Sequence, residues 1–168
     1  MIDELQPQAV IFSDGGPGCR WVGNEKGFAG ATNWSFLRAG EVYPGYPNYR
    51  ELQYGHADGN QWVAAECDVS IRPGWFYHPE EDGRVKTVDE LTDLYYRSVG
   101  HNATLLLNFP VDRDGLIHPT DSANAVNFHK NIQKQLEKNL LAGLSPKASD
   151  ERGKAFSAKA VTDNDYDT

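Results

Sequence analysis

The sequence predicts an α/β fold built around a parallel β-sheet, and two kinds of pattern support this prediction. Residues 9–13 and 104–108 are short apolar runs, and residues 63–70 read as a further strand; all three are bounded by loop-forming residues, and we expect each to be buried on both faces of a parallel sheet. Residues 88–99 and 122–140 repeat apolar side chains every three or four positions, which is typical of amphipathic helices. Because strands that alternate with helices form parallel sheets, we expect the three strands to be parallel neighbours with both helices packed outside them.

The connections differ in how clearly the sequence defines them. The stretch from Gly15 to Gly59 is rich in Gly and Pro and has no period of 2 or 3.6, so we expect a long irregular connection, which is usually functional. The helix over 88–99 has a clear beginning. Thr87 and Glu90 form a capping box, in which each side chain satisfies a backbone donor of the other residue.

The chain is expected to be a segment of a larger protein. Three strands would leave two open sheet edges, and the helices could not cover both faces. The sequence also starts on the end of a helix at residues 2–6 and stops within a polar stretch at 144–168. That last stretch is either a disordered tail or the first strand of an all-β module.

Composition excludes several classes of protein. The 16 Lys and Arg against 24 Asp and Glu give a formal net charge of −8 and a pI near 5.0, which argues against binding nucleic acid or anionic lipid. No apolar run approaches the roughly 20 residues that a membrane span requires, and residues 1–4 do not resemble a signal peptide. The sequence therefore predicts a soluble, acidic, globular chain.

Metal binding is not predicted. The five histidines are scattered without an H-x-x-x-H pair, and Cys19 and Cys67 lack the paired spacing of a zinc site. The two cysteines could form one disulfide, but two buried or half-buried thiols are the favoured interpretation.

Aromatic residues and carboxylates point to a binding or catalytic site. All four tryptophans and five of the eight tyrosines fall within residues 21–77, a crowding that favours a binding face over a core. Glu25 lies in a glycine-flanked loop close to Trp21, where it is either a solvated carboxylate or a general acid kept protonated by an apolar environment. Glu66 and Asp68 lie two positions apart on a predicted strand, so their side chains share one face of the sheet. They are either a pair of active-face carboxylates or a salt-bridged structural pair.

At these residues the sequence closely resembles the α-L-fucosidases of glycoside hydrolase family 29. The matching stretches cover about residues 3–140, and they are AVIFSD at 9–14, RWVGNE at 20–25, AECDVSIRPGWFYH at 65–78 and LLLN at 105–108. The G-N-E loop and the long form of the third stretch resemble the subgroup that prefers branched α-1,3/1,4-linked fucosides.

The resemblance implies a fold and an activity. Residues 1–143 would be the C-terminal part of a (β/α)8-like TIM barrel, and residues 144–168 would begin a β-sandwich domain. The family hydrolyses α-L-fucosides with retention of configuration and requires no metal or organic cofactor. The implied partner is a fucosylated oligosaccharide, with no nucleic acid and no membrane span, and a periplasmic, extracellular or lysosome-like compartment is expected for the parent protein.

The resemblance also implies site residues. Glu25 takes the place of the general acid/base, and Trp75 takes the place of an aromatic residue that packs on fucose. Trp21, Arg72 and Glu66 are the other predicted substrate-binding residues.

Two features depart from the family pattern. The nucleophilic Asp of the family lies in an upstream W-x-D-G motif, which this chain lacks, so we expect the chain alone to be inactive. A loop that usually reads G-P-D reads Gly16-Pro17-Gly18 here. The rival interpretation is a non-catalytic carbohydrate-binding module, which would also explain the aromatic-rich loops and the acidic charge.

Overall fold

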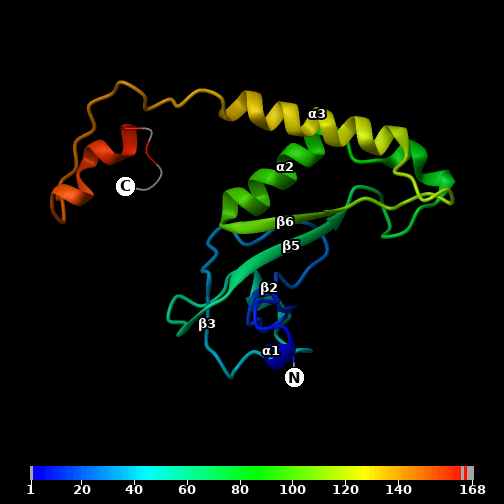
Figure 1. Cartoon of the computed structure of the whole chain (residues 1–168), viewed down its shortest axis with the longest axis horizontal. Helices are drawn as coiled ribbons and strands as arrows, with labels where there is room; N and C mark the ends of the chain where they lie inside the picture. The colour runs from blue at the N-terminus through cyan, green and yellow to red at the C-terminus, as the bar shows by residue number, and fades with distance from the viewer. Residues whose placement is uncertain (1, 164, 166–168) are drawn as a thin grey trace. The chain divides into compact units, whose positions relative to one another are not determined.

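The computed structural model describes residues 2–163 and 165, and it divides into two compact units, residues 1–129 and 130–168. The first unit contains a four-stranded, wholly parallel sheet in the order β1-β2-β5-β6 (Figure 1). Its strands are β1 (Phe12–Ser13), β2 (Cys19–Trp21), β5 (Ala64–Ser70) and β6 (Ala103–Asn108). The prediction of a mixed α/β fold with a parallel sheet is confirmed.

The order of the strands corrects one detail of that prediction. β2 lies between β1 and β5, so the first two predicted strands are not neighbours. The sequence did not predict β2 because residues 19–21 contain no apolar run. The central residue of the strand is Arg20, which is fully buried. Its guanidinium donates to Leu52 O at 3.0 Å, Val63 O at 2.6 Å and Asn33 Oδ1 at 2.5 Å. Burial lowers the pKa of Arg20 to about 10, so it stays charged at neutral pH.

The two long helices form where they were expected. α2 (Val88–Ser98) begins at the predicted capping box, with Glu90 N donating to Thr87 Oγ1 and Thr87 N donating to Glu90 Oε2 at 2.7 Å. α3 (Pro119–Leu136) starts three residues before the predicted range of 122–140 and ends four residues before its end. A short helix, α1 (Ile2–Leu5), matches the helix end expected before Pro7.

The apolar core lies on one face of the sheet. Leu91 and Leu94 of α2 pack against Val69 and Ile71, and Leu105, Leu107, Phe109 and Phe128 pack around them. Figure 1 shows α2 next to β6, crossing it at an angle. Paired residues of neighbouring parallel strands point to the same face of the sheet, and successive residues of one strand point to opposite faces. The face away from α2 therefore carries the residues that alternate with the core residues of each strand. Those residues include the carboxylates singled out above.

The long connection over 15–59 is more ordered than the sequence indicates. Besides β2, it contains β3 (Phe36–Leu37), which pairs antiparallel with β4 (Gln61–Trp62), and a 3-10 helix, η1 (Tyr49–Gln53). Further 3-10 helices are η2 (Pro79–Arg84) and η3 (Val99–His101). These elements are two to six residues long, too short to show a period in the sequence.

The two outer strands of the sheet expose apolar side chains. Val10 and Phe12, in and before β1, are 75% and 45% exposed, and Leu106 of β6 is 46% exposed. The prediction that these strands are buried on both faces is therefore wrong for this chain, because the structure covers one face of the sheet only.

The second unit has little regular structure beyond the end of α3. Two 3-10 helices, η4 (Lys154–Phe156) and η5 (Ala158–Thr162), lie within the polar segment. The strand expected in 144–168 is absent from residues 144–163 and 165, so its place in a β-sandwich stays a prediction. Across the part of the chain that the structure describes, no helix is both long and apolar enough to cross a bilayer.

Candidate active site at the carboxyl edge of the sheet

The face of the sheet opposite α2 carries polar and aromatic side chains. The strand register places Trp21 beside Glu66, and Glu66 is followed on the same face by Asp68 and Ser70. Trp21 Nε1 donates to Asp68 Oδ1 at 2.8 Å. The Cys19 thiol donates to Glu66 Oε2, with sulfur and oxygen 3.9 Å apart. Glu66 and Asp68 thus lie on one face without a basic partner in these contacts.

The two carboxyls hold protons more tightly than ordinary acids do. Burial raises the pKa of Glu66, and the nearby charge of Asp68 raises it further. Burial also raises the pKa of Asp68, although its bond from Trp21 acts in the opposite direction. The charge of Glu25 adds to the raised pKa of Asp68, so the three carboxyls share one electrostatic environment. Of the two interpretations of the pair, this arrangement favours active-face carboxylates.

Glu25 lies next to Trp75, as the predicted site requires. Trp75 Nε1 donates to Glu25 Oε2 at 3.1 Å, although the two residues are 50 positions apart in the chain. The glycines on either side fix the loop: Gly23 and Gly27 both have positive φ angles, and a side chain on Gly27 would collide with Val69. Glu25 is exposed, which matches the solvated carboxylate of the two interpretations of the sequence and does not match an acid in an apolar environment.

The loop that carries Trp75 is attached to the ends of two strands. Asn108, the last residue of β6, donates through Nδ2 to Trp75 O at 3.0 Å and to Ser70 Oγ at 3.1 Å. Ser70 is the last residue of β5, and its hydroxyl also accepts from Arg72 N at 3.3 Å. The sequence places Asn108 at a strand end but does not predict these bonds, since they join residues 33 and 38 positions apart.

Arg72 is placed differently from the sequence prediction. Its side chain is buried, and it donates to Asp121 Oδ2 at 2.8 Å, Asp121 Oδ1 at 2.9 Å and Asp82 Oδ1 at 2.9 Å. The bonds to Asp121 raise the pKa of the guanidinium above its ordinary value. With its donors engaged in the interior, Arg72 anchors the loop after β5 rather than reaching a ligand. Asp121 has no sequence signal that would have revealed this pairing.

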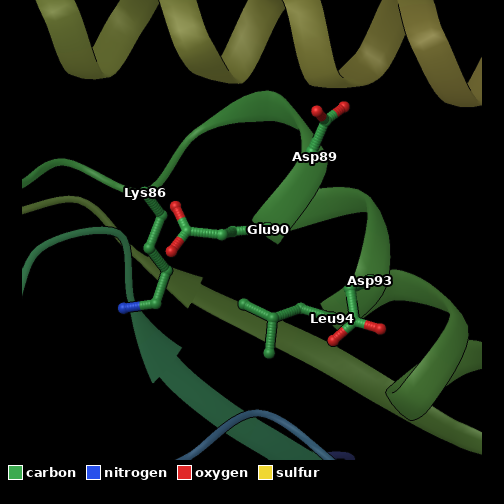
Figure 2. Close-up of a pocket in the computed structure, with 5 residues that line it drawn as sticks. All are labelled: Lys86, Asp89, Glu90, Asp93 and Leu94. Carbon is green, nitrogen blue, oxygen red and sulfur yellow. The ribbon is translucent and has the colours of Figure 1, made fainter.

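A surface hollow of about 440 Å³ lies elsewhere in the first unit (Figure 2). It is lined by Lys86, Asp89, Glu90, Asp93 and Leu94, and Leu94 belongs to the core on the helix side of the sheet. Lys86 Nζ donates to Ser70 O at 2.7 Å, and burial lowers the pKa of Lys86. The hollow is lined by acidic rather than aromatic side chains, so it does not continue the site around Glu25.

The thiols and other potential ligands fit no metal site. Cys19 is half-buried and Cys67 is buried, and both are free, in agreement with the favoured interpretation of the sequence. Burial raises the pKa of Cys67 to about 12. Within residues 2–163 and 165, no group of three His, Cys, Asp or Glu side chains could hold a metal ion.

Fold and site together have the features of a carbohydrate-active α/β protein. Catalytic groups of (β/α) barrels lie at the carboxyl ends of parallel strands. Glycoside hydrolysis needs carboxyl groups, and tryptophan rings offer flat apolar area beside them. Here Trp75 and Glu25 follow the carboxyl ends of β5 and β2, while Trp21 ends β2 itself.

Comparison with known proteins names a more particular group. No protein-family model matches the chain. Alpha-L-fucosidase 1 of Arabidopsis thaliana is 48% identical over 126 residues, which are 72% of this chain and 24% of the relative. A provisionally named α-L-fucosidase 1 of Oryza sativa subsp. japonica is 44% identical over 155 residues, which are 91% of this chain and 29% of the relative. The chain therefore spans less than a third of the length of these relatives.

Solved structures give the same result. A crystal structure of a provisionally named α-L-fucosidase from Bacteroides thetaiotaomicron superposes with a TM-score of 0.91 at 45% identity, covering 99% of this chain and 37% of that one. The glycoside hydrolase 29 fucosidase of Ruminococcus gnavus in complex with fucose superposes with a TM-score of 0.65 at 36% identity, covering 73% and 24%. The mixed α/β fold of this chain thus matches that of glycoside hydrolase family 29 fucosidases.

Proposed function

We propose that this chain is part of an α-L-fucosidase of glycoside hydrolase family 29, a retaining enzyme that releases L-fucose from fucosylated glycans. The observation that carries the proposal is the 3.1 Å bond between Trp75 Nε1 and Glu25 Oε2. It joins the two residues that the family resemblance assigned to the general acid/base and to the sugar-packing aromatic. The named relatives, both α-L-fucosidases, support the same activity.

The proposal extends to architecture and specificity. Residues 1–143 would be the C-terminal part of a (β/α)8-like barrel, and residues 144–168 would begin a β-sandwich. The parallel sheet with its helices on one face supports the first assignment, because the inner face of a barrel carries no helices. The G-N-E sequence at 23–25 is the basis for proposing the subgroup that acts on branched α-1,3/1,4-linked fucosides.

The proposed mechanism is a double displacement. An Asp outside this chain attacks the anomeric carbon of fucose while Glu25 gives its proton to the leaving oxygen. Glu25 then takes a proton from the water that releases fucose from the covalent intermediate. Retaining enzymes hold the two carboxyls about 5–5.5 Å apart. The chemistry needs carboxyl groups only, so we propose no metal or organic cofactor.

Other side chains would bind and orient the sugar. Trp75 is half-buried, so part of its ring remains available to pack against fucose. Glu66 would accept hydrogen bonds from sugar hydroxyls, which are abundant donors. Trp21 would act beside it, held in place by Asp68. Arg72 is not included among the proposed sugar contacts because its donors are bound to Asp121 and Asp82.

The test uses the complete protein that carries this chain and two substrates that differ in leaving group. The variant Glu25→Ala should lose about 10²-fold or more in kcat/KM on a natural fucosylated oligosaccharide, since general-acid assistance contributes that much. This parameter reports the departure of the leaving group and excludes the later release of fucose from the intermediate, which is common to both substrates. The loss should be much smaller on a nitrophenyl α-L-fucoside, whose leaving group needs little protonation. Equal losses on both substrates would contradict the general-acid role.

The alternative is a non-catalytic carbohydrate-binding module. The exposure of Glu25 favours it, because a binding module needs no buried acid at this place. The same preparation separates the two functions. Binding of fucosylated oligosaccharide by the complete protein, without release of fucose from either substrate, would establish the alternative.

A further inference from the structure

The position of the Glu25 carboxylate depends on Trp75. Glu25 lies on an exposed loop, where a glutamate side chain is otherwise free to sample several rotamers. The indole N–H of Trp75, 3.1 Å from Glu25 Oε2, restricts the freedom of the carboxyl group, whose other oxygen would carry the proton. General-acid catalysis requires the donor within hydrogen-bond reach of the leaving oxygen, so whatever fixes Trp75 also fixes the acid.

Trp75 itself lies outside regular secondary structure. It falls between the end of β5 and the start of η2, in a segment where backbone pairing with the sheet has ended. Its carbonyl oxygen accepts from Asn108 Nδ2 at 3.0 Å, and the same nitrogen lies 3.1 Å from Ser70 Oγ. The backbone oxygen of Asn108 accepts from Ile71 N at 3.0 Å. One residue at the end of β6 thus binds both the loop and the end of β5.

Few side chains could take this place. A carbonyl oxygen accepts only, so the group opposite Trp75 O must be a donor, and here it donates to Ser70 Oγ as well. A carboxylate at position 108 would place oxygen against the carbonyl oxygen. An apolar residue of the same size would leave both acceptors without this donor. An amide with two N–H bonds meets both needs.

We infer that Asn108 is a positioning residue for the proton transfer by Glu25, acting through the backbone of Trp75. It does not need to touch the sugar or the leaving group. Its amide fixes the loop, the loop fixes the indole, and the indole fixes the carboxylate. The inference rests on the proposed function, because only a proton donor to the leaving group would make this chain of contacts matter for the rate.

The test compares Asn108→Leu with a matched control in the complete protein. Asn124→Leu removes a similar bond, from Asn124 Nδ2 to Lys86 O at 2.9 Å, which involves neither Trp75 nor Glu25. The expected result for Asn108→Leu is a loss of about tenfold in kcat/KM on the natural oligosaccharide and less than about twofold on the nitrophenyl fucoside. Asn124→Leu should change both substrates by the same factor. Asn108→Asp keeps the side-chain shape and gives the same pattern if the leucine variant folds poorly.

A double-mutant cycle with Trp75→Phe tests whether the effect passes through the indole. Phenylalanine keeps an aromatic ring for the sugar but has no N–H for Glu25. If Asn108 acts through Trp75, the losses of the two single variants on the natural substrate are not additive in the double variant. Additive losses, or equal losses of Asn108→Leu on both substrates, overturn the inference while leaving fucosidase activity intact. If the unmodified protein hydrolyses neither substrate, the proposed function fails and this inference fails with it.

Discussion

The buried ion pair between Arg72 and Asp121 should be the most sensitive point of the fold. Both side chains have no exposed surface, and two hydrogen bonds of 2.8 and 2.9 Å join them across 49 positions of the chain. Asp121→Asn keeps the shape but removes the charge and places an NH2 group against one of the guanidinium nitrogens. One charge-assisted bond is lost and the other is weakened, at about 1.5–3 kcal/mol for each full bond.

The expected cost is about 3 kcal/mol in the free energy of unfolding. That value lies at the lower end of the range of about 3–5 kcal/mol for breaking a buried pair, because Asp82 still binds the guanidinium at 2.9 Å. Urea titration of the complete protein measures it. The control is Asp93→Asn, which breaks an exposed pair with Arg97 at 3.3 Å and should cost under about 0.5 kcal/mol. A loss of less than about 1 kcal/mol for Asp121→Asn would show that Asp82 alone neutralises Arg72, and the anchoring role would have to be abandoned.

Three further predictions follow from the site and the sheet. Burial raises the folded-state pKa of Glu66, so ionisation of this carboxyl lowers the stability of the protein as pH rises above the unfolded pKa of about 4.3. Glu66→Gln should therefore stabilise the protein at neutral pH. Urea titrations should show that this stabilisation disappears below about pH 4. Cys67, buried with a pKa of about 12, should resist iodoacetamide in the native protein while half-buried Cys19 reacts slowly, and mass spectrometry showing equal native labelling would contradict this ranking. Residues 1–168 expressed alone should release no fucose from a nitrophenyl fucoside, because the proposed nucleophile lies outside this chain. The same preparation should associate as its concentration rises, which light scattering would measure, because Val10, Phe12 and Leu106 are exposed. Turnover comparable to that of the complete protein would contradict the first half of that prediction.

Local chemistry allowed the sequence to predict much of the scaffold. The capping box at Thr87 and Glu90 marks the start of α2 because its two bonds span only three residues. The alternating apolar residues of β5 and the apolar run of β6 predict these strands, because the face of the sheet that packs against α2 needs apolar side chains. The period of the helical segment likewise places Leu91 and Leu94 on the stripe that packs into the core.

The candidate site could be predicted only in part. The family resemblance selected Glu25 and Trp75, which the structure joins by a hydrogen bond, whereas the predicted role of Arg72 does not fit its buried position. An arginine next to a predicted site is equally consistent with a ligand contact and with an internal ion pair. Its partner, Asp121, decides between them, and nothing in the residues around Asp121 marks it as that partner.

What the sequence by itself determined was therefore the set of elements whose stabilising contacts are local or periodic. The tertiary structure alone decided the insertion of β2 through the buried Arg20, the pairing of Arg72 with Asp121 and the attachment of Trp75 to Asn108. Each of these depends on hydrogen bonds between polar groups 33 to 49 positions apart. Such bonds leave no period in the sequence, because their energy depends on the direction and distance of two particular groups that meet only after the sheet has formed.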